Sequence, residues 1–133
     1  MLLTRETDYA LRVLRSLLPG EQRAVGEISK QQMIPQQFAY KIVKKLSRAG
    51  LVKVSRGVDG GCRLTADLTQ VSLYDLMVAM DARSDVNACM DPGFTCPWRQ
   101  QNGGCCVHNR LADIQQRMDD ELRRCDLMSL LQE

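Results

Sequence analysis

The sequence predicts a mainly α-helical protein with one small β-hairpin: a winged helix-turn-helix followed by a long C-terminal dimerisation helix. Three observations support this fold class. Apolar residues recur at helical spacing in three segments of the first 50 residues, and two short strand-like runs around a glycine-rich turn follow them. A narrow apolar seam then runs through the last part of the chain.

Two helices are expected before residue 35. Residues 4–18 carry apolar side chains at helical spacing, and the Pro-Gly pair that follows ends the run. Residues 24–33 show the same spacing over a shorter length. The side chains expected to face the core are Ala10, Val13, Leu14 and Leu17 in the first helix and Val25, Ile28 and Met33 in the second.

A third helix is predicted from Pro35 to the residue before Gly50. Proline suits the first turn of a helix, and glycine suits the position just after its end. Its expected apolar stripe is Phe38, Ile42, Val43 and Leu46. The polar and basic residues of this helix lie mostly off the stripe.

Residues 51–55 and 61–65 have strand character, and the sequence RGVDGG lies between them. Such glycines fit a turn that needs positive φ, so a β-hairpin is expected here. Ser72 then starts a further helix, and Asp75 is spaced to complete a capping box with it.

The composition, 44% hydrophobic and 26% charged residues, is that of an ordinary globular domain. Residues 1–25 contain no long apolar run, so neither a secretory signal nor a membrane span is expected and a cytoplasmic location is predicted. Residues 1–68 hold 12 Lys or Arg against 6 Asp or Glu, whereas residues 69–133 hold 6 against 10. A basic first half suggests a polyanion-binding module.

In a helix-turn-helix the third helix reads double-stranded DNA, because its apolar stripe packs inward and leaves the other face for the major groove. Gln36, Gln37 and Tyr40 are placed to reach base edges. The residues placed to neutralise phosphates are Lys41, Lys44 and Arg48. The hairpin is expected to lay Arg56 near a minor groove. For any single one of these residues, a plain solvent-facing role remains the alternative.

The final helix is expected to begin near Cys105 and to run to about Leu127. Its apolar residues are spaced by three and four positions, as in a coiled-coil seam. A two-fold dimer contact is favoured over docking on the chain's own domain. The seam consists of Leu111, Ile114, Met118, Leu122 and Cys125.

Four of the six cysteines and the only histidine fall within residues 89–108, inside or next to an irregular loop of residues 85–106. Thiols stay reduced in the cytosol, so this density favours a metal or redox role over a disulfide framework. Cys62 and Cys125 are expected to be packing residues. Cys89 and Cys96 have no apolar run around them that would bury them, so packing does not explain them.

Cys105 and His108 form a C-x-x-H pair at the start of the last helix, and this spacing places both side chains on one helical face. The helix N-terminus favours a thiolate at this position. The full ligand spacing, C-x₆-C-x₈-C-x₂-H, is loose for structural zinc and is compatible with an iron–sulfur cluster. The residues alone leave both metals open.

Several stretches together resemble the bacterial Rrf-type (IscR- and NsrR-like) iron–sulfur winged-helix transcriptional regulators. They are LTRETDYALRVL, IPQQFAYKIVKKLSRAGLV, SRGVDGGCRL, VSLYDLMVAM and CCVH, and they extend over nearly the whole chain. The resemblance implies a homodimer on a palindromic operator and a cluster, 2Fe–2S or 4Fe–4S, held by Cys89, Cys96 and Cys105. It implies either His108 or Asp8 as the fourth ligand, the latter reaching from the partner subunit, and Cys106 can replace Cys105.

These observations predict a DNA-binding domain in residues 1–68. Residues 69–133 would then supply a helix, the cluster-binding loop and the dimerisation helix. The predicted function is a transcriptional regulator, a repressor, that senses iron, redox state or nitric oxide, with no catalytic residues. A cluster-carrying electron-transfer protein and a metal-free thiol sensor are the alternatives.

Overall fold

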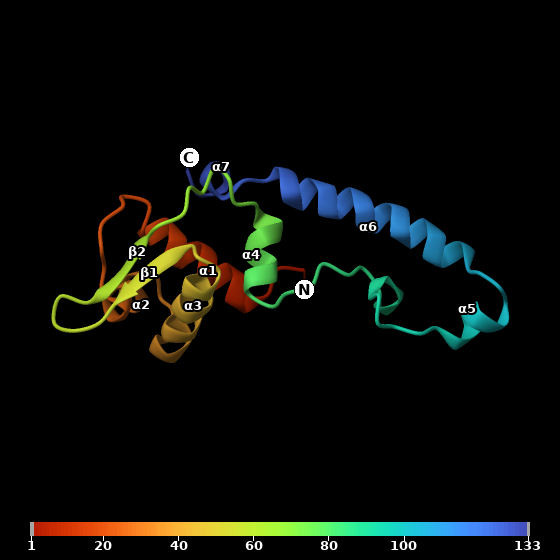
Figure 1. Ribbon diagram of the computed structural model, residues 1–133, viewed down its shortest axis with the longest axis horizontal. Coiled ribbons are helices and arrows are strands. Elements are labelled where there is room, and N and C mark those ends of the chain that lie inside the picture. The colour runs from red at the N-terminus through yellow and green to blue at the C-terminus, as the bar shows by residue number, and fades with distance from the viewer. Residues whose placement is uncertain (1, 133) are drawn as a thin grey trace.

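The computed structural model describes residues 2–132, which form an elongated molecule with a head at one end and a long arm at the other (Figure 1). The head contains three helices and a hairpin in the predicted order. They are α1 (Arg5–Ser16), α2 (Val25–Gln31), α3 (Gln36–Arg48), β1 (Val52–Ser55) and β2 (Gly61–Leu64). The mainly helical fold with one antiparallel hairpin is therefore confirmed.

The hairpin is joined to the first connection of the head. β1 and β2 pair antiparallel with Val52 opposite Leu64. Arg23 then forms a β-bridge with Cys62 through two backbone hydrogen bonds of 2.9 and 2.8 Å. Gly61 has φ of +152°, and a Cβ atom there would collide with the carbonyl of Arg23. This close approach requires glycine.

The core of the head is made by the apolar faces of α1, α2 and α3, as the spacing predicted. The inward residues of α1 and most of those expected in α2 and α3 are less than 10% exposed. They are Ala10, Val13, Leu14, Leu17, Val25, Ile28, Ile42, Val43 and Leu46.

The expectation for Met33 is wrong, because this side chain is 83% exposed. α2 ends at Gln31, and Met33 adopts φ of +55°, so helical spacing no longer applies at this position. Ile34 takes the inward place at 3% exposure. Two hydrogen bonds hold it there: its N–H donates to the Ser29 carbonyl, and the Ser29 hydroxyl donates to the carbonyl of Ile34.

Phe38 also departs from the expected stripe and is 43% exposed. Its ring lies edge-on against Tyr9 with a centroid distance of 6.0 Å. Ala39, with no exposed surface, occupies the core position beside it.

The arm is built from the 3₁₀ turn η1 (Ala88–Met90), α5 (Pro97–Gln101) and α6 (Cys106–Arg124). It is joined to the head by α4 (Leu73–Ala79), whose Leu76 and Met77 are buried in the core of the head. α4 begins with the predicted capping box: the Ser72 side chain accepts from the N–H of Asp75, and the Asp75 carboxylate accepts from the N–H of Ser72. From α4 the chain runs outward past η1 to α5 at the far end, and α6 returns toward the head (Figure 1).

The last helix is shorter than predicted, because α6 ends at Arg124 and a separate helix, α7 (Leu127–Leu131), follows. Asp126 caps α7 by accepting from the N–H of Ser129 at 2.9 Å. Leu127 is fully buried in the head, and its N–H donates to the Val71 carbonyl at 2.8 Å. The break therefore turns the chain back onto the head. Within residues 2–132, every helix is too short or too polar to cross a bilayer.

Candidate nucleic-acid interface and cysteine loop

α3 exposes one polar face beside the hairpin. Pro35 is the N-cap residue, so the helix begins at Gln36, and its opposite face is buried through Ala39, Ile42 and Leu46. Every residue predicted to contact DNA is exposed. These residues are Gln36, Gln37, Tyr40, Lys41, Lys44, Arg48 and Arg56.

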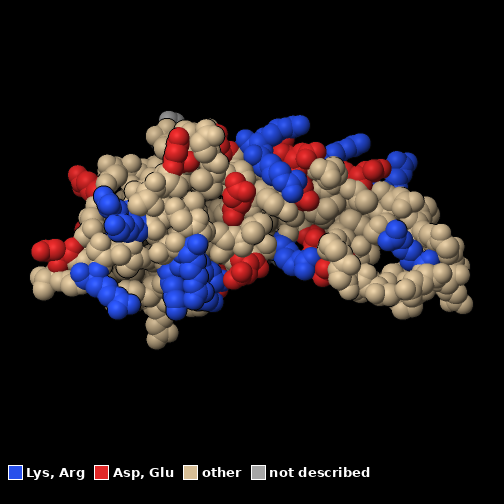
Figure 2. All heavy atoms as spheres, viewed as in Figure 1, with Lys and Arg blue, Asp and Glu red and all other residues tan. Residues whose placement is uncertain are grey.

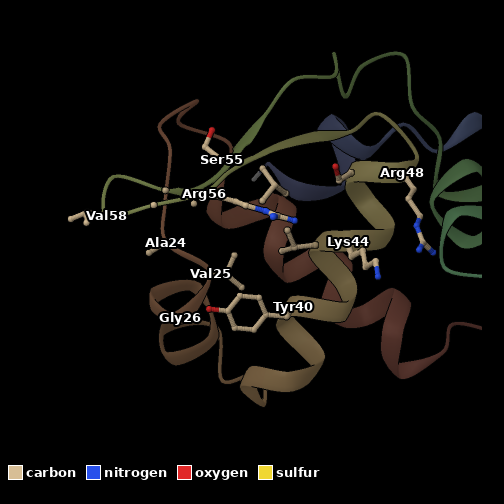
Figure 3. A pocket seen from close by; sticks show the side chains of 15 residues that line it. Ala24, Val25, Gly26, Tyr40, Lys44, Arg48, Ser55, Arg56 and Val58 are labelled. Carbon is tan, nitrogen blue, oxygen red and sulfur yellow. The ribbon is translucent and has the colours of Figure 1, made fainter.

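A hollow of about 940 Å³ is bordered by α3, the hairpin and the start of α2 (Figure 3). Four of the seven predicted residues line it: Tyr40, Lys44, Arg48 and Arg56. Ser47 lines it as well and was not among the predicted contacts.

The Arg56 side chain extends from the hairpin across the hollow toward α3, and Tyr40 extends from α3 toward α2 (Figure 3). The tip of the hairpin is instead formed by Val58, which is fully exposed. Arg56 thus faces the same concave space as Lys44. Two cations facing one hollow favour a negatively charged occupant such as a phosphate group.

Basic side chains gather over α3 and the hairpin, whereas acidic and basic side chains alternate along α6 (Figure 2). Carboxylates of the same chain neutralise part of the positive charge on this surface of the head. Glu6 of α1 forms ion pairs with Lys41 and with Lys45, the latter at 2.6 Å. Lys45 also lies 2.9 Å from Asp81, which follows α4.

These ion pairs shift the pKa values of Glu6 and Lys45. Hydrogen bonds from Lys41 and then Lys45 lower the pKa of Glu6 below its ordinary value. Hydrogen bonds to Glu6 and then to Asp81 raise the pKa of Lys45. Glu6 and Lys45 are 39 residues apart in sequence, so no local pattern signals their pairing.

Asp8, one of the two candidate fourth ligands, lies on α1 in the head. Its carboxylate forms an ion pair of 2.9 Å with Arg12 and is about half exposed. Arg12 also donates to the carbonyl of Gln32, at the end of α2, over 3.2 Å. Asp8 is therefore held by its own helix.

The three candidate cysteine ligands occupy three separate turns of the arm. Cys89 lies in η1, Cys96 is the N-cap residue of α5, and Cys105 is the N-cap residue of α6. All three are partly buried and free, whereas Cys106 is exposed. Among residues 2–132, no three His, Cys, Asp or Glu side chains lie close enough together to hold one metal ion.

The start of α6 has the features of a ligand pair. The Cys105 sulfur accepts a hydrogen bond of 3.4 Å from the backbone N–H of His108. The Nδ1 atom of His108 is enclosed and has no hydrogen-bond partner within the described chain. A cysteine sulfur next to an imidazole nitrogen without a hydrogen-bond partner fits the donor set of an iron–sulfur cluster or of zinc.

The other two cysteines differ from this group. Cys62 has no exposed surface, and burial raises the pKa of its thiol to about 11. It is a packing residue, as expected. Cys125 is partly buried and packs against the core at the end of α6.

Fold and surface together define a winged-helix protein with a basic recognition helix and a cysteine-bearing arm. Residues 3–133 match the Rrf2 family, described as "Iron-dependent Transcriptional regulator". The chain belongs to this family of transcriptional regulators. The predicted resemblance is thereby confirmed.

Curated relatives include a transcriptional regulator. The chain is 30% identical over 134 residues to the HTH-type transcriptional regulator IscR of Vibrio vulnificus, with 98% of this chain and 77% of that protein covered. It is 31% identical over 100 residues to Protein aau3 of Rhizobium meliloti, with 73% of this chain covered. The chain spans 65% of the length of aau3.

Solved structures share the fold. CymR (YrzC), the global cysteine regulator of B. subtilis, matches with a TM-score of 0.70 at 17% identity, covering 98% of this chain and 96% of that chain. The oxidized form of Staphylococcus aureus CymR gives 0.68 at 18% identity, with 100% and 98% covered. T. potens IscR gives 0.65 at 15% identity, with 98% and 86% covered.

Proposed function

We propose that this protein is a DNA-binding repressor whose affinity for DNA responds to an iron–sulfur cluster on its arm. The observation that supports DNA binding is the hollow between α3 and the hairpin, which is lined by Tyr40, Lys44 and Arg56. A buried apolar face fixes α3 on the head, so its polar face is free to enter a major groove.

In this mode Gln36, Gln37 and Tyr40, near the start of α3, contact base edges. Lys44 and Arg56 contact the phosphates that border the groove, which adds affinity without sequence preference. Lys41 contributes less, because Glu6 already neutralises part of its charge.

A homodimer would place two copies of α3 on the two halves of a palindromic operator. The support for dimerisation is that no residue of α6, from Cys106 to Arg124, is buried in the single chain. The predicted seam is only partly covered, and Ile114 within it is 52% exposed. A second copy of α6 would bury this seam.

Cys89, Cys96 and Cys105 would hold the cluster, with His108 or Asp8 as the fourth ligand. A bound cluster supplies a centre that iron shortage, oxygen or nitric oxide can damage. His108 has a free ring nitrogen for this role, whereas Asp8 would first have to leave Arg12. Gathering the three thiols requires the loop to move, which gives the protein two conformations that a ligand can favour unequally.

Anaerobic purification followed by iron and sulfide analysis tests the cluster. Wild-type protein is expected to be coloured, and Cys89→Ala, Cys96→Ala and Cys105→Ala should each abolish the colour. Cys125→Ala, which removes a thiol at the other end of α6, is the matched control and should retain it. A colourless wild-type protein that carries stoichiometric zinc would contradict the cluster and leave DNA binding intact.

DNA binding is tested with a palindromic duplex selected from a random pool. Affinity should fall steeply with salt. Arg117→Ala, on the exposed face of α6, removes one positive charge far from the head and should leave affinity unchanged. Loss of salt dependence would contradict the proposed mode.

A second candidate is a metal-free thiol sensor. It is favoured by the separation of the three loop cysteines, which leaves each thiol free in this arrangement. This candidate predicts a reversible disulfide under oxidant, together with full DNA binding in protein that contains no iron.

A further inference from the structure

Asp81 has an unusual backbone conformation at the end of α4. It adopts φ of +55° and is one of two non-glycine residues with positive φ among residues 2–132. The Ala82 N–H donates to the Met77 carbonyl at 2.8 Å, and the Asp81 N–H donates to the Val78 carbonyl at 3.0 Å. These two bonds form a Schellman motif, whose left-handed position is usually glycine. Aspartate costs more backbone free energy there than glycine would, which makes its side chain a candidate for a role.

The side chain of Asp81 reaches the recognition helix. Its carboxylate lies 2.9 Å from the ammonium group of Lys45, a side chain that is only 17% exposed. The same ammonium group lies 2.6 Å from Glu6 of α1, and Glu6 also pairs with Lys41. Lys45 is therefore held by two carboxylates, one from α1 and one from the residue that follows the C-cap of α4.

These four side chains carry no net charge together, because two lysines pair with two carboxylates. Lys44 and Arg48, and not Lys41 and Lys45, line the hollow. Neither Lys44 nor Arg48 forms an ion pair with any of residues 2–132. The positive charge of α3 is therefore concentrated on the edge beside the hairpin, and the edge beside α1 is neutral.

We infer that Asp81 is a positioning residue for the recognition helix: its carboxylate holds Lys45, keeps this edge of α3 neutral and thereby lowers the affinity for duplex DNA. Without Asp81, Lys41 and Lys45 would share the single carboxylate of Glu6, so one positive charge on α3 would be uncompensated. Lys41 is 53% exposed and lies one turn from Lys45, so this charge can reach a phosphate. The inference rests on the proposed DNA binding and is independent of the cluster.

The chain supplies a matched pair of variants. Asp81→Asn removes the carboxylate charge and keeps the turn, because asparagine also occupies the left-handed position of this motif. Asp85→Asn removes the same charge four residues further along the same connection, where the described ion pair of Asp85 is with Arg83 at 2.6 Å. Both variants should have melting temperatures close to that of wild type, because exposed ion pairs contribute little to stability.

The first measurement is a fluorescence anisotropy titration of a duplex selected for binding to wild type. Asp81→Asn should bind about 2- to 5-fold more tightly at low salt, and this gain should shrink as salt screens the freed charge. Asp85→Asn should bind as wild type. A gain in affinity cannot come from a damaged head, so it separates an electrostatic role from a structural one. Unchanged or weaker binding of Asp81→Asn, or an equal gain in Asp85→Asn, would overturn the inference.

The second measurement repeats the comparison in a Lys45→Gln background. Asp81→Asn should now give no gain, because its carboxylate no longer has a lysine of α3 to neutralise. A gain as large as in the wild-type background would overturn the inference, since Asp81 would then act on DNA directly and not through Lys45. A wild-type protein that binds no duplex would refute the proposed function, and the role of Asp81 with it.

Discussion

Lys45 of the recognition helix lies 2.6 Å from Glu6 of α1 and is only 17% exposed, although the basic residues of α3 were expected to face outward. The same carboxylate also binds Lys41. Two of the four cations of α3 are therefore tied to the head, and the positive charge available to DNA is smaller than the sequence indicates.

Glu6→Gln is expected to increase affinity for duplex DNA. The substitution frees Lys41 and Lys45 from their carboxylate partner, so the DNA-facing side of the head becomes more positive. The gain should be about 2- to 5-fold at low salt, the range of an exposed ion pair of about 0.5–1 kcal/mol. Fluorescence anisotropy titrations measure it. Glu21→Gln removes the same charge from the exposed connection after α1, and an equal gain in that variant would contradict the local explanation.

Lys44→Ala should weaken DNA binding more than Lys41→Ala does. Lys44 has no carboxylate partner among residues 2–132, whereas Lys41 is paired with Glu6. Removing one phosphate contact should lower the slope of affinity against salt by about 1 and cost about 1 kcal/mol. Titrations at several salt concentrations compare the two variants. A larger loss for Lys41→Ala would show that its ion pair opens on DNA.

Stability should depend on Glu6 at acid pH. Lys41 and Lys45 lower the pKa of Glu6 below its ordinary value of 4.5. The stabilisation is therefore fully present above pH 4.5 and is lost as the pH falls through the lower pKa of the folded state. Urea unfolding should show Glu6→Gln to be about 1 kcal/mol less stable than wild type at pH 7, and this difference should shrink as the pH is lowered below 4.5. A difference that stays constant with pH would argue against the ion pairs as its source.

Cys62 should resist alkylation in the folded protein. Its thiol has no exposed surface and a pKa raised to about 11, so roughly one molecule in a thousand carries the reactive thiolate at pH 8. Exposed Cys106 is the internal comparison. Iodoacetamide labelling and mass spectrometry should find Cys106 modified well before Cys62. Similar labelling rates would mean that the hairpin opens readily.

Gly61→Ala should destabilise the head more than Gly57→Ala. Both glycines have positive φ, of +152° and +102°, so both variants strain the backbone by about 1–2 kcal/mol. Only at Gly61 does the new Cβ meet the Arg23 carbonyl, which adds a further cost of about 1–3 kcal/mol. Thermal unfolding compares the two. Equal melting temperatures would show that the bridge between Arg23 and Cys62 tolerates displacement.

Local patterns predicted the elements of this fold because local forces define them. Helical spacing located α1 and α3, Pro35 marked the start of α3, and the capping box at Ser72 located α4. The same reasoning misplaced Met33, because it extended helical spacing past the end of α2 into a left-handed turn. It also extended α6 past Arg124, where the capping of α7 by Asp126 competes with helix continuation.

The sequence predicted which residues belong to the candidate site, but not how they are arranged in space. The exposed face of α3 follows from its apolar stripe, so the DNA contacts could be proposed from spacing alone. The direction of Arg56 across the hollow could not, because it depends on how the hairpin packs beside α3 (Figure 3). The sequence shows where the cysteines lie along the chain. It could not predict that the first part of their loop is attached to α6.

The sequence by itself determined the order of helices and hairpin, the basic recognition face and the resemblance to the Rrf-type regulators. These depend on side-chain periodicity, capping and turn chemistry, which act between near neighbours in the chain. Only the tertiary structure decided that Glu6 neutralises part of α3 and that Asp81 pairs with Lys45. Such contacts join residues about 30 to 40 positions apart, and they form only when packing brings two elements to the same place.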